Sequence, residues 1–170
     1  MALRIIRIET CFSPLHTAAM KHATVSTQFG DLVLTQEGEH ITRLDWGRAA
    51  HEESTDVLEE ARRQLLAYDA GVLEQFDLPL WVHGSHFQRA VCDVMFAIPF
   101  GETVTYGDIA KQLDVPAQAV GGACGGNPIP IIIPCHRVMG AKGLTGFSGA
   151  GGVETKVALL RHEGAGGFLI

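Results

Sequence analysis

The chain has 170 residues, enough for one large domain or two small ones. Its 46% hydrophobic content argues against intrinsic disorder, and no apolar run approaches the ~18 residues needed to cross a bilayer, which excludes a membrane protein. The formal net charge of -6 excludes a broadly basic surface that binds phosphates along its length, and it argues mildly against a nucleic-acid partner.

Residues 1–19 are expected to form an extension ahead of the fold. Arg4, Arg7 and Glu9 interrupt the apolar residues of this segment, so it lacks the uninterrupted core of a secretory signal. A second methionine, Met20, precedes the first run with strand character. The four cysteines match no disulfide framework or zinc motif. The sequence therefore predicts a cytoplasmic protein with reduced thiols and no bound metal.

Residues 20–81 are predicted to form a small α/β domain. Three β-rich runs (ATVSTQ, LVLTQ and HITRLDW) are separated by glycine-containing turns, which is typical of an antiparallel meander. The following segment, TDVLEEARRQLLAYDAG, predicts one helix that ends at Gly71. Its apolar residues at helical spacing are Val57, Ala61, Leu65 and Leu66.

Residues 82–170 are predicted to form a second, helical domain. The run SHFQRAVCDVMFAI has apolar residues on one helical face, and TYGDIAKQLDV and PAQAVGGACGG follow it as two shorter helices. A tight connection at Asp114 and Val115 joins these two helices, which predicts a helix-turn-helix. Any small helical hairpin fits the same pattern. The fold class is therefore α/β, with a small N-terminal sheet-plus-helix domain and a helical C-terminal domain.

The segment NPIPIIIPCHRVMG, residues 127–140, is the most unusual part of the chain. Its three prolines and three consecutive isoleucines cannot form a helix, so we expect a stiff, extended and buried connector. The connector presents Cys135 next to His136 and Arg137. A thiolate is a strong nucleophile, and nearby positive or proton-accepting groups lower the pKa of a thiol. We therefore interpret Cys135 as a nucleophile.

A free cysteine is more often a small buried apolar residue. We accept that interpretation for the three other cysteines, Cys11, Cys92 and Cys124. In an extended segment the side chain of His136 points away from Cys135, because adjacent side chains alternate faces. His136 is therefore expected to reach the thiol through backbone curvature or a bridging water.

The run PCHRV, preceded by GNPIPIII and followed by LTGFSG, closely resembles the active-site signature of the O6-alkylguanine-DNA alkyltransferases, also called methylated-DNA–protein-cysteine methyltransferases. The resemblance extends back through FQRAVCDVMFAIPFGETVTYGDIA and AVGGA, and forward to ETKVALLRHEG. It covers the last half of the chain densely and the first half only in outline.

The resemblance implies DNA repair by direct reversal of damage. The protein would bind double-stranded DNA through the minor groove, as a monomer, and flip O6-alkylguanine into a pocket. A cysteine thiolate would then accept the alkyl group once and keep it, and O4-alkylthymine would be a weaker substrate. The reaction implied needs no metal or organic cofactor. Residues 82–170 would be the alkyltransferase and DNA-binding domain.

The resemblance also implies roles for catalytic residues. Cys135 matches the alkyl acceptor, His136 the base that deprotonates it through water, and Glu163 the carboxylate that orients the histidine. Asn127 matches the hinge residue that joins the turn to the helix-turn-helix. Tyr106 matches the residue that presses on the target phosphate and donates a proton to the leaving guanine. Taken singly, Glu163 also fits a solvated helix end, Tyr106 a core aromatic residue and Asn127 a turn residue.

Two further groups follow from the same resemblance. The DNA-binding residues are expected to be Thr105, Tyr106, Gln118, Ala119 and Gly122. The base pocket is expected to include Cys124, Val138 and Ser148, with the Val138 carbonyl accepting a hydrogen bond from the exocyclic amine of guanine. Arg137 is interpreted as a structural residue that pairs across the domain interface rather than as a DNA contact.

Two of the departures of the sequence from the family bear on the recognition helix and on the pocket. Gln118 stands where the family usually has an arginine that fills the place of the flipped nucleotide, and glutamine lacks the charge and the five-donor fork of arginine. The run FSGAGGVET is about two residues longer than usual and borders the pocket. We expect weak, salt-sensitive DNA binding and an altered tolerance for bulky adducts. The net charge of -6 therefore bounds how strongly the protein holds DNA, not whether it does.

Two rival functions remain at this point. A lesion-recognition protein would bind O6-alkylguanine with slow or no repair, but known proteins of that kind lack the cysteine that stands here at Cys135. A cysteine hydrolase would use Cys135 and His136, but it needs an oxyanion hole, and nothing after IIIPC predicts a helix N-terminus to supply one.

Replacing Gln118 with arginine is expected to tighten duplex binding and to speed repair, because the guanidinium adds a charge and a planar donor fork to the recognition helix. Both quantities are measured with a duplex that contains O6-methylguanine, over a range of salt concentrations. Equal duplex affinity and repair rate in Gln118→Arg and the unaltered chain would contradict this expectation.

Overall fold

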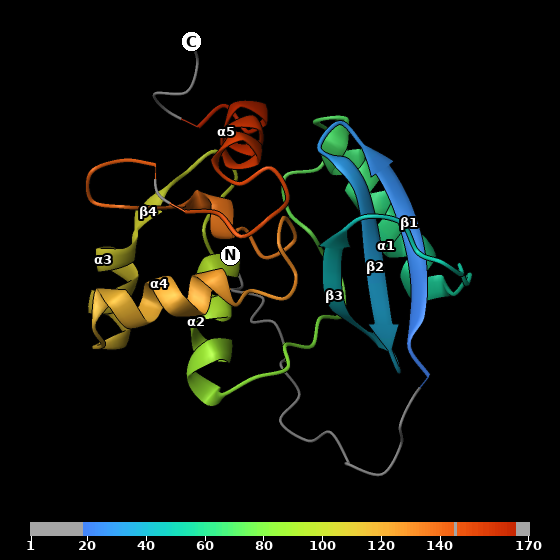
Figure 1. Cartoon of the computed structure of the whole chain (residues 1–170), viewed down its shortest axis with the longest axis horizontal. Helices are drawn as coiled ribbons and strands as arrows, with labels where there is room; N and C mark the ends of the chain where they lie inside the picture. Colours follow the sequence, from blue (N-terminus) through green and yellow to red (C-terminus); the bar gives the residue numbers. More distant parts are fainter. Residues whose placement is uncertain (1–18, 145, 166–170) are drawn as a thin grey trace.

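The structure is a computed structural model that describes residues 19–144 and 146–165. It contains a sheet with one helix from the first half of the chain, beside a group of helices from the second half (Figure 1). This arrangement confirms the predicted fold class. The expected extension over residues 1–19 lies, except for its last residue, outside the described residues. In the described part of the chain no helix is long and apolar enough to span a membrane.

The N-terminal sheet is an antiparallel meander in the order β1-β2-β3. Its strands are β1 (Lys21–Thr27), β2 (Gly30–Glu37) and β3 (His40–Trp46). Thr27 pairs with Gly30 and Glu37 pairs with His40, so both hairpins turn within two residues, as the glycine signals predict. Alternating side chains supply the buried face of the sheet: Ala23, Val25, Leu32, Leu34, Ile41 and Leu44.

Helix α1 (Asp56–Asp69) covers one face of this sheet (Figure 1). The Thr55 hydroxyl caps it by accepting a hydrogen bond from the backbone N–H of Leu58 at 3.1 Å. Its buried apolar face consists of Leu58, Ala61, Leu65 and Tyr68. Leu66, which the spacing placed on the apolar side, is instead 45% exposed. It lies beside the buried face of the helix rather than on it.

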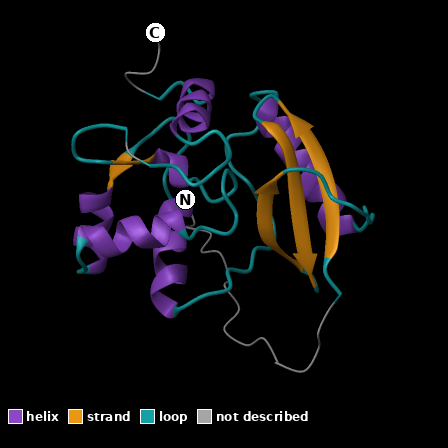
Figure 2. Ribbon diagram, viewed as in Figure 1, coloured by secondary structure: helices purple, strands orange, loops and turns teal. Residues whose placement is uncertain are grey.

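The C-terminal part is mostly helical (Figure 2). Its helices are α2 (His86–Phe96), α3 (Tyr106–Leu113), α4 (Ala117–Gly125) and α5 (Val153–His162). Two short parallel strands, β4 (Val104–Thr105) and β5 (Val138–Met139), and the one-turn 3₁₀ helix η1 (Cys135–Arg137) complete it.

Helices α3 and α4 form the predicted hairpin. A capping box starts α3: the Thr105 hydroxyl accepts from the Asp108 N–H at 3.1 Å, and the Asp108 carboxylate accepts from the Thr105 N–H at 2.8 Å. Asp114 ends the helix in the left-handed conformation, with φ of 54°. Pro116 is the N-cap residue of α4. The tight connection at Asp114 and Val115 is as the sequence predicts.

The isoleucine-rich connector is buried as predicted, but it is not extended. The Ile133 N–H donates to the Ile129 carbonyl at 2.8 Å, and Ile131 has a φ of 71°, a conformation that a β-branched residue rarely adopts. The side chain of Asn127 supports these turns, accepting from the Ile129 N–H at 3.1 Å and donating to the Ile133 carbonyl at 2.8 Å. The connector thus folds back on itself because one amide side chain satisfies its backbone groups.

Strand β3 joins the two parts of the molecule. It is the sheet strand nearest to the C-terminal helices (Figure 1), and the backbone N–H of Leu44 donates to the carbonyl of Pro128 at 2.9 Å. This contact ties the edge of the N-terminal sheet directly to the connector that carries Cys135.

Candidate active site

Cys135 begins the 3₁₀ turn η1 and is 6% exposed. The sequence did not predict this turn. Burial raises the pKa of the Cys135 thiol, while the Asn127 side chain, the charge of Lys156 and nearby backbone N–H groups act in the opposite direction. The site therefore holds a protonated thiol that is surrounded by groups able to stabilise its anion.

His136 is completely buried, and its two ring nitrogens have different environments. Nε2 lies 2.6 Å from Oε1 of Glu163, whereas Nδ1 has no hydrogen-bond partner among the described residues. Burial lowers the pKa of the imidazole, so the neutral ring donates its Nε2 proton to the carboxylate and leaves Nδ1 as an acceptor. The backbone at Cys135 and His136 forms a 3₁₀ turn in place of the expected extended geometry.

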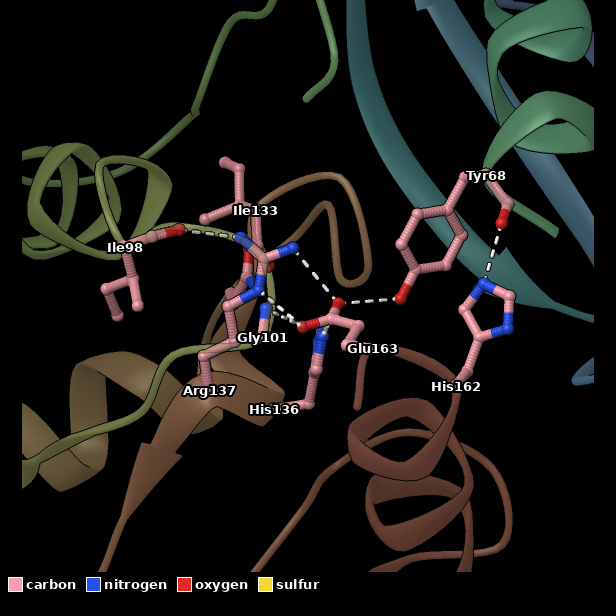
Figure 3. A network of polar contacts seen from close by, with 9 residues as sticks. Tyr68, Ile98, Gly101, Ile133, His136, Arg137, His162 and Glu163 are labelled. Carbon is pink, nitrogen blue, oxygen red and sulfur yellow. Dashed lines mark hydrogen bonds and ion pairs between the residues drawn. The ribbon is translucent and has the colours of Figure 1, made fainter. Parts of the chain in front are cut away.

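Glu163 is the buried centre of the polar contacts in Figure 3. Besides His136, it accepts hydrogen bonds from Arg137, at 2.8 Å from Nε and 3.0 Å from Nη2, and from the hydroxyl of Tyr68 at 2.7 Å. Burial would raise the pKa of this carboxyl group, but the hydrogen bonds from His136 and Arg137 outweigh it and hold the pKa well below its usual range. Glu163 caps the C-terminal end of α5, yet it is not the solvated residue that this position also suggested.

Arg137 is a buried structural residue, as expected, but its hydrogen-bond partners lie in its own half of the chain. It pairs with Glu163 and donates to the Ile98 carbonyl at 2.6 Å (Figure 3). Both partners lie in the C-terminal half, so the predicted pairing across the domain interface is wrong for this residue. Its charge already neutralises the carboxylate, which is a second reason why His136 stays neutral.

Tyr68 makes the contact between the two halves that sequence reasoning missed. It comes from α1, is buried, and bonds to Glu163 across 95 positions of the chain. The Nε2 atom of His162 lies 2.7 Å from the Tyr68 carbonyl and anchors the same residue from α5 (Figure 3). The sequence analysis did not include Tyr68 among the apolar residues at helical spacing. A buried tyrosine hydroxyl needs a partner, but nothing local identifies a distant glutamate as that partner.

Lys156 is also absent from the sequence-based site, although it is completely buried. Its Nζ donates to the Val138 carbonyl at 2.6 Å. Burial lowers the pKa of Lys156, and the nearby thiols of Cys135 and Cys124 oppose that shift. The Val138 carbonyl, expected to contact a guanine amine, therefore already accepts one hydrogen bond, from Lys156.

A pocket of about 310 Å³ opens beside Cys135. The structure brings four of the predicted residues together in its wall, while Val138 is buried behind it. The lining residues are Tyr106, Gly121, Cys124, Gly125, Cys135, Gly146, Phe147 and Ser148. The sequence did not single out Phe147, although it follows directly in the LTGFSG run.

The expected DNA-binding residues fall into two groups. Gln118, Ala119 and Gly122 are exposed on α4, the helix whose Gly121 and Gly125 line the pocket. The Thr105 hydroxyl, in contrast, is engaged in capping α3. Among the described residues no cluster of three or more His, Cys, Asp or Glu side chains could hold a metal ion.

Comparison with known proteins gives the same family for both halves of the chain. Residues 20–82 match the family model described as 6-O-methylguanine DNA methyltransferase, ribonuclease-like domain, and residues 86–165 match the one described as 6-O-methylguanine DNA methyltransferase, DNA binding domain. A methylated-DNA–protein-cysteine methyltransferase of Methanosarcina acetivorans is 40% identical over 157 residues, which cover 86% of this chain and 99% of that protein. One from Mycobacterium tuberculosis is 42% identical over 152 residues, with 84% and 91% covered.

Solved structures agree. The crystal structure of Mycobacterium tuberculosis O6-methylguanine methyltransferase superposes with a TM-score of 0.75 at 39% identity, covering 86% of this chain and 93% of that one. The structure of Mycobacterium tuberculosis OGT in complex with DNA gives a TM-score of 0.76 at 42% identity, covering 88% and 97%.

Replacing Tyr68 with phenylalanine keeps every ring contact and removes only the hydroxyl that donates to Glu163. Because hydrogen bonds to charged groups contribute about 1.5–3 kcal/mol, we expect the free energy of unfolding in urea to fall by about that amount. Tyr106→Phe is the matched control, since the other tyrosine is only partly buried and its loss of a hydroxyl should cost less. Equal stabilities of Tyr68→Phe and the unaltered chain would argue against the contact.

The lowered pKa of His136 makes stability depend on pH. Below the unfolded-state pKa of about 6.5 the unfolded chain takes up a proton that the folded chain refuses, so the free energy of unfolding falls as pH falls, by up to about 1.4 kcal/mol per pH unit. Glu163 adds to this loss only below about pH 4.5, where the unfolded carboxylate becomes protonated.

Urea unfolding between pH 7.5 and pH 5 tests this dependence on His136. His136→Gln should flatten the slope of unfolding free energy against pH, while His51→Gln, at an exposed position, should keep it. The same slope in both variants would show that His136 does not titrate as described.

Proposed function

Because the chain belongs to the methylated-DNA–protein-cysteine methyltransferase family, we propose that it repairs DNA by moving the alkyl group of O6-alkylguanine, and more weakly that of O4-alkylthymine, to Cys135. The family predicted from PCHRV is confirmed, and with it the assignment to this class of enzyme. One observation carries the proposal: Cys135 lines a pocket and is followed in the chain by a buried histidine, whose Nε2 lies 2.6 Å from a buried carboxylate.

Helix α4 is proposed to meet the duplex as part of the α3–α4 helix-turn-helix. It exposes Gln118, Ala119 and Gly122, and a Cβ atom built at Gly121, Gly122 or Gly125 would touch nothing within 4 Å. Because these residues are small, the sugar-phosphate backbone that borders a minor groove could approach the helix closely. Gln118 would fill the gap that the flipped nucleotide leaves, without a charge to hold the strand.

The pocket beside α4 is the proposed site for the flipped base. Extrusion of a nucleotide costs a few kcal/mol of lost stacking and pairing, and contacts inside the pocket must offset this cost. The Ser148 side chain and the Val138 carbonyl are the proposed polar contacts to the guanine. The glycines of α4 would form the flat wall on which the base lies.

The transfer itself is proposed to run through a bridging water. His136 Nδ1 accepts the thiol proton through that water, while Glu163 holds Nε2 and balances the charge that develops on the ring. The sulfur then attacks the alkyl carbon: the S–C bond forms as the C–O6 bond breaks, and the electron pair stays on guanine. Tyr106 donates a proton to the leaving base. Because the thioether is stable, each molecule acts once.

Asn127 and Lys156 support the thiolate in this scheme. Both lower the pKa of Cys135 against the effect of its burial, the first by a hydrogen bond and the second by its charge. Burial also strengthens these interactions, because the site has a lower dielectric constant than water. The geometry thus combines a shielded thiol with a fixed environment for its anion.

A mass measurement tests the proposal. The protein is incubated with a duplex that contains O6-methylguanine, and the intact mass and peptide map are recorded. One methyl group on the Cys135 peptide is expected, and it should be absent in Cys135→Ser. Cys92→Ser is the matched control, because this buried thiol does not line the pocket and its pKa is raised to about 11.

The other outcomes separate the rival functions. Tight binding to the lesion without a change of mass would replace the proposal by a lesion-recognition protein. Methyl transfer to a cysteine other than Cys135 would overturn the assigned nucleophile. In His136→Gln we expect the transfer rate to fall by about 10²–10⁴-fold, the usual contribution of a positioned general base.

A further inference from the structure

The loop that closes the pocket packs against the N-terminal domain. Phe147 lines the pocket together with Cys135, and its ring also meets the ring of Trp46 edge to face, with centroids 6.0 Å apart and an interplanar angle of 86°. Trp46 is the last residue of β3. A residue of the N-terminal sheet therefore lies directly behind one wall of the pocket.

Trp46 is held in place from its own domain. Its indole N–H donates to the carbonyl of Phe29 at 3.0 Å, and Trp46 pairs with Leu32 in the sheet register. A Cβ atom at Gly30 would lie only 3.4 Å from Cδ1 of the indole. The ring is thus fixed by a hydrogen bond, by the strand and by the tight turn beneath it, so it is a firm support rather than a loose contact.

The space between the two rings and the loop is already full. A Cβ atom built on Gly149 would lie 2.7 Å from Cη2 of Trp46 and would collide with the ring of Phe147 as well. Contacts this short leave no room for even one methyl group. The ring of Phe147 is therefore blocked on the side that faces Trp46 and Gly149.

The pocket beside Cys135 is small among ligand pockets. Its volume of about 310 Å³ is near the lower end of the range of ligand pockets, about 300–1,000 Å³. A group larger than methyl on the O6 atom needs more space than methyl does, and a shift of Phe147 away from the pocket is one way to provide it. Trp46 stands where that movement would go.

We propose that Trp46 is a specificity-determining residue: by supporting Phe147 from behind, it limits the size of the O6 substituent that the pocket accepts. The inference rests on the proposed alkyl transfer and adds to it a preference for methyl over benzyl-sized groups. Trp46 touches neither the substrate nor Cys135, so it is a positioning residue that acts through Phe147. The N-terminal domain thereby takes part in substrate selection.

The test compares two transfer rates in each protein. Duplexes carrying O6-methylguanine or O6-benzylguanine at the same position are reacted with the unaltered chain, Trp46→Leu and Trp81→Leu, and alkylation of Cys135 is followed by mass. Trp46→Leu should raise the benzyl-to-methyl rate ratio roughly ten-fold, the discrimination that a tight apolar pocket achieves per small group. Trp81, whose ring lies against His40 and His83, is the matched control and should leave the ratio unchanged.

A general loss of structure has a different signature. If both rates fall together in Trp46→Leu, or if the ratio stays at the value of the unaltered chain, Trp46 does not select the substrate. Trp46→Phe preserves an aromatic contact and should raise the ratio less, which keeps the question open to measurement if the leucine variant unfolds. Absence of methyl transfer in the unaltered chain would instead refute the proposed function and is measured first.

Discussion

The charge of Glu163 is the constraint on which the site depends. A carboxylate buried to this extent is tolerated only when it is paired and fully hydrogen-bonded, and removing a partner from a buried pair costs about 3–5 kcal/mol. Arg137 provides the opposite charge, while His136 and Tyr68 provide further donors. Each donor is thereby held in one orientation. The same charge thus determines the tautomer of the histidine, the position of α5 and the docking of the N-terminal helix α1.

The two halves of the chain work as one unit because of such contacts. The N-terminal domain reaches the C-terminal site at three levels: the Tyr68 hydroxyl at the carboxylate, the Leu44 backbone at the connector and the Trp46 ring behind the pocket loop. All three residues lie in a regular helix or strand. Each matters because it contacts a residue of the C-terminal half, so the sheet and α1 support the candidate site in that half.

Local signals explain which features the sequence predicted. The hairpin glycines, the Thr55 and Thr105 caps and the Asp114 turn are encoded within a few residues, so the strands, α1 and the α3–α4 pair were predictable. The turns of the connector were not, because they depend on side-chain bonds from Asn127. Cys135, next to His136, was singled out from its stiff, proline-rich segment, whereas a role for Glu163 was assigned only through the family resemblance. Three other residues that support the site were not predicted, because their sequence patterns suggest a different role. Tyr68 and Trp46 resemble core residues, and a lysine such as Lys156 is almost always exposed.

The conformation of Ile131 has a consequence for how the nucleophile arises. A β-branched residue with a φ of 71° is strained by about 1–3 kcal/mol and persists only where its surroundings impose it. The isolated connector would therefore relax to another shape, and the turn that brings Cys135 and His136 together would be lost. The surroundings of Cys135 described above therefore belong to the finished fold alone. During synthesis, or after partial unfolding, Cys135 is an ordinary cysteine without the buried neighbours that surround it in the fold.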